Sequence, residues 1–133
     1  MNDDLMTIRE MCDTFGVTPR TLRFYEAKEL LSPRRVGQKR LFTRRDRARL
    51  KLILRGKRFG FSLEELRQLL DLYDRGDRQE TQIATAYALA ERRLAEMERQ
   101  RAELDSAISE LREQMRWGFK ILGDFKKPRR AAG

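Results

Sequence analysis

The chain has 133 residues, of which 38% are charged and 40% are hydrophobic, a composition that supports one small core with an extension. A single cysteine, Cys12, and no histidine exclude an internal disulfide, a Cys/His zinc site and a Cys–His nucleophile pair. No apolar run approaches the roughly 18 residues of a membrane span, and the acidic start MNDDL lacks a signal peptide's positive region, so we expect a cytoplasmic protein with no membrane partner.

The net charge of +9 comes entirely from the first half of the chain. Residues 1–61 carry 16 basic and 7 acidic side chains, whereas residues 62–133 carry 14 of each. The excess of positive charge in residues 1–61 predicts that this half of the chain binds a polyanion. The other half, which has no net charge, is expected to have a different role. The alternative is a soluble basic protein with no such surface.

Two short helices are the first predicted elements. Thr7 can cap a helix over the segment IREMCDTF, and Gly16 follows it where a helix end favours a left-handed residue. Thr18 can cap a second helix that begins at Pro19 and runs to about Lys28. Two short helices joined by a glycine turn, with basic residues early in the second, are typical of the helix-turn-helix of DNA-binding proteins.

A small basic hairpin comes next. The Ser32-Pro33 pair ends helical structure, and short strands over residues 34–36 and 39–42 can form on either side of Gly37-Gln38. Residues 7–42 therefore predict one DNA-docking unit, in which a helix enters the major groove and a hairpin contacts the adjacent backbone.

Two more helices complete the first half. Thr43 can cap a helix over residues 44–59, which Gly60 ends. Ser62, with Glu65 three residues later, forms a capping box that opens the next helix. We expect residues 73–79 to form a loop or hinge, because a glycine stands there among four charges.

A strict heptad pattern marks the second half. Steps of four and three connect Ile83, Tyr87, Ala90, Leu94, Met97, Arg101, Leu104, Ile108, Leu111 and Met115, with no Gly or Pro between them. The stripe is too narrow and too long to be buried on the chain's own small domain, so these residues predict a homodimer through a coiled coil. Arg101 at a core position weakens the seam but can fix its register. The alternative is a helix that folds back on its own domain.

We therefore expect three segments: a DNA-binding domain over residues 1–76, a dimerisation helix over residues 77–116 and a tail over residues 117–133. The apolar residues of the tail can pack at the ends of the dimer helices or line a small pocket; they are Trp117, Phe119, Ile121, Leu122 and Phe125.

The segment TPRTLRFYEAKELL, followed by the hairpin and GFSLEEL, resembles the MerR family of bacterial transcriptional regulators. The resemblance implies a mainly α fold, with a winged helix-turn-helix domain, a small β-hairpin wing and a long helix that forms an antiparallel coiled-coil dimer. It also implies that the dimer binds a near-palindromic operator in double-stranded promoter DNA and distorts that DNA to bring promoter elements into phase for RNA polymerase.

The resemblance also implies which residues contact DNA. Arg20 and Arg23 occupy the groove-facing positions of the recognition helix, and Tyr25 occupies a phosphate-binding position. The full expected set is Thr18, Arg20, Thr21, Arg23, Tyr25, Arg34, Arg35, Lys39, Arg40, Lys57 and Arg58. Arginine suits these positions because it can read guanine with two hydrogen bonds and neutralise phosphate.

Other residues of this half have plainer expected roles. We expect Leu22 and Phe24 to pack against the first helix, Glu26 to be structural and Cys12 to be a core thiol. At least some of Arg44, Arg45, Arg47 and Arg49 are expected to be solvated charges. Glu29 departs from the family pattern, because a glycine often ends the recognition helix there.

No cofactor or metal is expected, because metal-sensing members of the family use cysteines near the end of the dimer helix and this sequence has none after Cys12. Residues 45–74 resemble a subgroup linked to branched-chain amino acid and fatty acid catabolism, which implies an acyl-CoA or similar effector, or none. An enzyme is not expected, since paired catalytic groups and a phosphate loop are missing. The alternative function is a nucleoid or recombination accessory protein that bends DNA without an effector.

Overall fold

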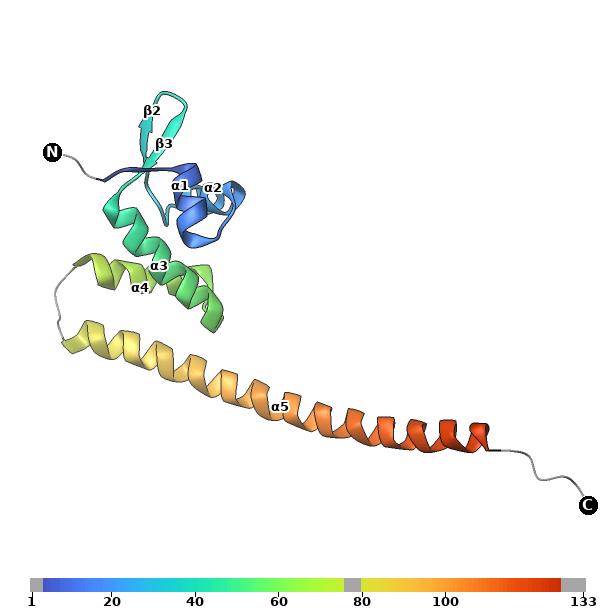
Figure 1. Ribbon diagram of the computed structural model, residues 1–133. Helices are drawn as coiled ribbons and strands as arrows, with labels where there is room; N and C mark the ends of the chain where they lie inside the picture. The colour runs from blue at the N-terminus through green and yellow to red at the C-terminus, as the bar shows by residue number, and fades with distance from the viewer. Residues whose placement is uncertain (1–3, 76–79, 128–133) are drawn as a thin grey trace, which may run out of the picture. The chain divides into compact units, whose positions relative to one another are not determined.

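The computed structural model describes residues 4–75 and 80–127 (Figure 1). The chain divides into two compact units, Met1–Arg93 and Leu94–Gly133. The elements in chain order are β1 (Met6–Thr7), α1 (Ile8–Phe15), α2 (Pro19–Ala27), β2 (Arg34–Val36), β3 (Lys39–Phe42), α3 (Arg44–Phe59), α4 (Leu63–Arg75) and α5 (Glu80–Lys126). The predicted fold class, mainly α with a small hairpin and a long C-terminal helix, is confirmed.

The predicted caps set the bounds of α1 and α2. The Thr7 hydroxyl accepts a hydrogen bond from the Glu10 backbone N–H at 3.1 Å, and the Glu10 carboxylate accepts one from Thr7 N at 2.9 Å. Gly16 ends α1 with φ 66, in the left-handed region where a side chain would be strained. Thr18 caps α2 in the same way as Thr7 caps α1, with Thr21 N donating to its hydroxyl at 3.2 Å.

The hairpin is part of a three-stranded antiparallel sheet with the order β1-β3-β2. Strands β2 and β3 have the predicted bounds, and Gly37 begins their turn with φ 61. Strand β1 was not predicted from the sequence, because two residues are too few to show an alternating pattern. Met6 of β1 lies opposite Phe42, and Arg35 of β2 lies opposite Arg40 of β3.

One apolar core holds this first unit together. Its fully or nearly buried members come from α1, α2, β3, α3, α4 and the loop after α2; they are Met11, Leu22, Tyr25, Leu30, Leu31, Phe42, Leu50, Ile53, Leu66 and Leu70. Gly56 of α3 lets α4 approach closely, since a Cβ on Gly56 would overlap the Leu66 side chain. The capping box of Ser62 and Glu65 starts α4, as predicted.

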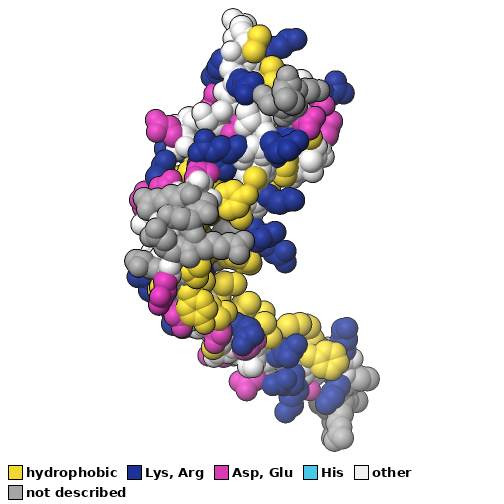
Figure 2. All heavy atoms as spheres, turned by 90° about the vertical axis from the view of Figure 1, so that its left-hand side faces the viewer, with side chains coloured by type: hydrophobic (Ala, Val, Ile, Leu, Met, Phe, Trp, Pro, Cys, Tyr) yellow, Lys and Arg dark blue, Asp and Glu magenta, His cyan; other side chains and the backbone are white. Residues whose placement is uncertain are grey.

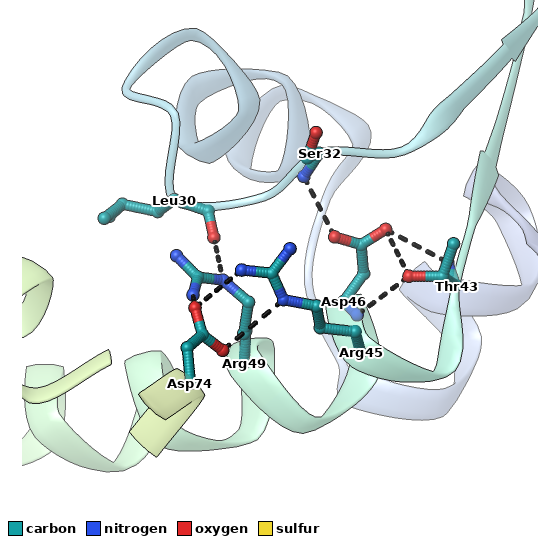
Figure 3. A network of polar contacts seen from close by, with 7 residues as sticks. All are labelled: Leu30, Ser32, Thr43, Arg45, Asp46, Arg49 and Asp74. Atoms are coloured by element: carbon teal, nitrogen blue, oxygen red, sulfur yellow. Dashed lines mark hydrogen bonds and ion pairs between the residues drawn. The ribbon is translucent and has the colours of Figure 1, made fainter. Parts of the chain in front are cut away.

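A buried carboxylate anchors the start of α3. Asp46 accepts hydrogen bonds from Thr43 N at 3.0 Å and from Ser32 N at 2.9 Å, so it fixes both the helix cap and the loop that leaves α2 (Figure 3). Asp46 is 2% exposed, and these donors satisfy it.

A second polar group joins α3 to the end of α4. Arg49 is buried, donates to the Leu30 carbonyl at 2.7 Å and forms an ion pair with Asp74, which also pairs with Arg45 at 2.6 Å (Figure 3). The expected loop at 73–79 is therefore wrong for its first three residues: α4 continues through Arg75, because these arginines hold Asp74 in place. Residues 76–79 lie outside the described part.

The second unit contains most of α5. We expected this helix to end near residue 116, but it continues through Lys126. Gly118 and Gly123 lie in this stretch, and each lowers the stability of the helix by about 1 kcal/mol relative to alanine. The heptad positions after Met115 are Gly118, Leu122 and Phe125, so the apolar spacing resumes at Leu122 and extends beyond Gly123.

The predicted seam lies on the surface of the single chain. The side chains of Tyr87, Leu94, Leu104 and Leu111 are more than half exposed, and hydrophobic groups are visible along the helix in Figure 2. No helix among the described residues is long and apolar enough to cross a membrane.

Candidate nucleic-acid interface

Helix α2 supplies the centre of the predicted interface. Arg20 and Arg23 lie on its exposed side, whereas Leu22 is fully buried, as expected. The hydroxyls of Thr18 and Thr21 lie 3.0 Å apart at the start of the helix. The predicted groove-facing arginines are therefore presented by a helix whose first turn is capped and whose opposite face is fixed in the core.

A hollow of about 390 Å³ joins α2 to the end of α3. Its lining includes four predicted DNA-binding residues, Arg20, Thr21, Tyr25 and Lys57, together with Phe24, Phe61, Leu63 and Leu66. Two cations beside a phenol and a threonine hydroxyl form a site suited to a backbone phosphate. Burial raises the pKa of Tyr25 above its ordinary value, so the phenol remains a neutral hydrogen-bond donor.

The exposure of Phe24 differs from what the sequence predicted. Phe24 was expected to pack against α1, but 45% of its surface is exposed, and its ring meets Tyr25 edge-on at 5.6 Å. The ammonium of Lys28 lies 5.7 Å from the centre of the Phe24 ring. Phe24 therefore belongs to the rim of the hollow. The spacing held a signal for this, because residues two apart in a helix point in nearly opposite directions, so Leu22 and Phe24 do not share one face.

A second hollow, of about 360 Å³, joins α2 to the hairpin. Arg23 of α2 and Lys39 and Arg40 of β3 line it, together with Thr7, Ile8, Gln38 and Leu41. Arg23 and the two cations of β3, which lie 16 and 17 residues after it in the sequence, thus form one cationic surface. Arg34 and Arg58 are exposed but line neither hollow.

Glu26 ties the hairpin to α2. Its carboxylate accepts from Arg40 Nε at 2.6 Å and from Arg35 Nε at 3.1 Å. Partial burial by itself raises the pKa of Glu26, but the hydrogen bonds and charges of Arg40 and Arg35 outweigh it, so the pKa lies below its ordinary value. Arg35 and Arg40 are direct cross-strand neighbours that would repel each other, and the shared carboxylate offsets that repulsion.

The described residues contain no group of three or more His, Cys, Asp or Glu that could hold a metal ion. Cys12 packs against the core of the first unit, in agreement with the expected core thiol. Burial raises the pKa of this thiol, which makes it less reactive at neutral pH.

Comparisons with known proteins match most of the chain. The family model for the MerR HTH family regulatory protein matches residues 6–72, and the model for MerR, DNA binding, matches residues 47–114. The HTH-type transcriptional regulator ZntR of Escherichia coli (strain K12) is 37% identical over 101 residues, which cover 74% of this chain and 70% of ZntR.

Two solved structures have a similar fold. HiNmlR, a MerR family regulator lacking the sensor domain and bound to promoter DNA, is 26% identical with a TM-score of 0.67, over 90% of this chain and 94% of that chain. PbrR691 from Ralstonia metallidurans CH34, in complex with lead(II), is 30% identical with a TM-score of 0.66, over 84% of this chain and 86% of that chain. The chain therefore belongs to the MerR family of DNA-binding transcription regulators and is not an enzyme.

Proposed function

We propose that this protein binds a near-palindromic promoter operator as a homodimer and regulates transcription by distorting that DNA. The observation that carries the proposal is the cationic surface around α2, where Arg20 lines one hollow with Lys57 and Arg23 lines another with Lys39 and Arg40. This order fits a recognition helix in the major groove with phosphate contacts on both sides.

The arginines of this surface have different proposed roles. Arg23, which has no ion pair with any other described residue, reads a base, and Arg20 reads a neighbouring base or its phosphate. Arg40 contacts phosphate through its terminal nitrogens, because its Nε is held by Glu26. Arg34 and Arg58, at the edges of the surface, add phosphate contacts that do not depend on sequence.

The exposed seam of α5 supports the homodimer. An antiparallel pairing of Ile83 through Met115 buries the apolar stripe that the single chain leaves on its surface and holds two copies of α2 at a fixed distance. HiNmlR, which has a similar fold, was solved on promoter DNA. Two fixed recognition helices can use part of their binding free energy to bend and untwist the DNA between them, which brings promoter elements into phase for RNA polymerase.

A small-molecule effector fits this chain better than a soft metal ion. PbrR691 was solved with lead(II), an ion for which thiolates are suitable ligands, but this sequence has no cysteine after Cys12. Any signal would act by favouring one geometry of the dimer on DNA.

Footprinting on genomic fragments tests the proposal. We expect the protein to protect one promoter spacer as two half-sites related by a two-fold axis. Uniform protection of unrelated DNA would contradict the proposal and would favour a nucleoid or recombination accessory protein instead.

A further inference from the structure

A groove between α1 and α3 lies outside the DNA-binding surface proposed above. Its volume is about 590 Å³, and its lining residues are Met6, Thr14, Phe15, Arg44, Arg47, Ala48, Lys51 and Leu54. None of these residues lines either hollow around α2. The groove is thus a separate feature of the first unit and shares no lining residue with the two hollows of the proposed DNA-binding surface.

The groove combines an apolar floor with a row of cations. Met6, Phe15 and Leu54 are partly buried and pack against the core, so the floor is rigid. Arg44, Arg47 and Lys51 follow one another at steps of three and four residues and therefore share one face of α3. At 1.5 Å per residue, the row extends over about 10 Å.

The chain's own Asp4 already occupies part of this row. Its carboxylate pairs with Arg44 at 2.9 Å, and its carbonyl oxygen accepts a hydrogen bond from Arg47. Asp4 has φ 48, a strained value for a residue with a side chain, which these contacts offset. Lys51 has no ion pair with any residue in the described ranges 4–75 and 80–127. The row therefore accepts acidic groups and retains an open cation.

The groove faces away from the hairpin side of α2. Met6 lines the groove, whereas the next residue, Thr7, lines the hollow that contains Arg23 and Lys39. Neighbouring residues of a strand point to opposite faces of the sheet. A ligand in the groove can therefore bind while DNA occupies the surface around α2.

We propose that this groove binds an acidic amphipathic helix of a partner protein. A small amphiphile has one charged head, which cannot use three cations spread over about 10 Å. An amphipathic helix can place acidic side chains one turn apart along Arg44, Arg47 and Lys51 and lay its apolar side on Phe15 and Leu54. The partner displaces Asp4 and takes over its ion pairs.

The test uses the full chain and a fluorescent peptide of about four helical turns, with a Glu face and a Leu face. We expect binding that Arg47→Gln with Lys51→Gln weakens about tenfold and that Asp4→Ala strengthens. The matched control, Arg9→Gln with Lys120→Gln, removes the same charge outside the groove and leaves binding within about twofold.

Each other outcome overturns the proposal. Equal weakening by both double variants would show general charge attraction, and displacement of the peptide by duplex DNA would place the groove in the DNA surface. Displacement by decanoate at similar concentration would assign the groove to small amphiphiles. A peptide that binds neither free nor DNA-bound protein would also rule out the proposal.

Discussion

Glu26 connects the recognition helix to both strands of the wing, formed by β2 and β3. Its carboxylate holds Arg35 and Arg40 through their Nε atoms and neutralises part of the charge of two residues that were predicted to contact DNA. An acidic residue on a basic surface thus has two effects: it fixes the direction of the wing arginines and limits their attraction to any phosphate.

Replacement of Glu26 by Gln should lower the specificity of DNA binding. The freed arginines bind phosphate on any duplex more strongly, while the wing loses its fixed position on the operator. We expect the ratio of operator to non-operator affinity to fall about tenfold, measured by anisotropy over a range of salt concentrations. Glu64→Gln, on the exposed side of α4, is the matched control, and an unchanged ratio in Glu26→Gln would rule out this role.

Glu29 keeps a conformation that glycine favours. It follows α2 with φ 61, at the position where the sequence departs from the family's glycine. Glu29→Gly should therefore raise the free energy of unfolding by about 1 kcal/mol, because a side chain in the left-handed region is strained. Urea unfolding measures this, with Glu29→Ala as the control that retains the strain. Equal stability of the two variants would contradict the explanation.

At the scale of elements, the sequence predicted the starts of α1, α2, α3 and α4, because each of these starts carries a local signal. Thr7, Thr18, Thr43 and Ser62 are short polar residues placed before apolar spacing, and their caps need only the next three residues. The strands of the wing were predicted for a similar reason, since Gly37 marks their turn.

Features that depend on distant partners were not predictable. The end of α4 depends on Asp74 meeting Arg45 and Arg49, which lie 29 and 25 residues earlier. The link from Glu26 to the wing, and the hollow that unites Arg20 with Lys57, likewise depend on the folded arrangement. The sequence therefore indicated which residues form the candidate site but not which of them form pairs.

The ion pairs of Asp74 give α4 a pH-dependent stability. The hydrogen bond from Arg45, helped by the charge of Arg49, outweighs partial burial and lowers the pKa of Asp74 below its ordinary value. A lowered folded-state pKa means that these pairs stabilise the protein above the unfolded pKa of about 4 and cease to do so as pH falls through the folded value.

Asp74→Asn should accordingly be less stable than the original chain by about 1–3 kcal/mol at neutral pH. The difference should shrink as pH falls below about 4, because the wild-type carboxylate then becomes neutral as well. Urea unfolding across pH measures both, with Asp71→Asn on the exposed side of α4 as the control. A difference that stays constant down to low pH would mean that charge is not the cause.

At the scale of the whole molecule, the proposed function assigns the DNA-binding surface to the first unit and its duplication in a homodimer to the long helix. In the single chain, the stretch of α5 beyond Arg93 has almost no buried side chain. Burial within the single chain therefore does not explain why these positions are apolar. The proposed homodimer would account for them, because a second copy would bury these apolar side chains in a coiled coil.

Replacing Leu94 and Leu104 with Lys should convert the dimer to monomers. Both side chains are more than half exposed in the single chain, so the substitutions leave its own fold intact while placing charges in the seam. Sedimentation velocity should report the monomer mass, with Glu98→Lys, outside the seam, as the matched control. A doubly substituted chain that sediments as a dimer would refute the seam.

Energy transfer between dyes at the two ends of the protected promoter fragment tests the central claim most directly, because it reports deformation of the DNA itself. We predict that the dimer brings the ends closer on this fragment and that the Leu94→Lys, Leu104→Lys chain does not. An end-to-end distance that stays the same when the fragment is saturated with dimer would contradict the account.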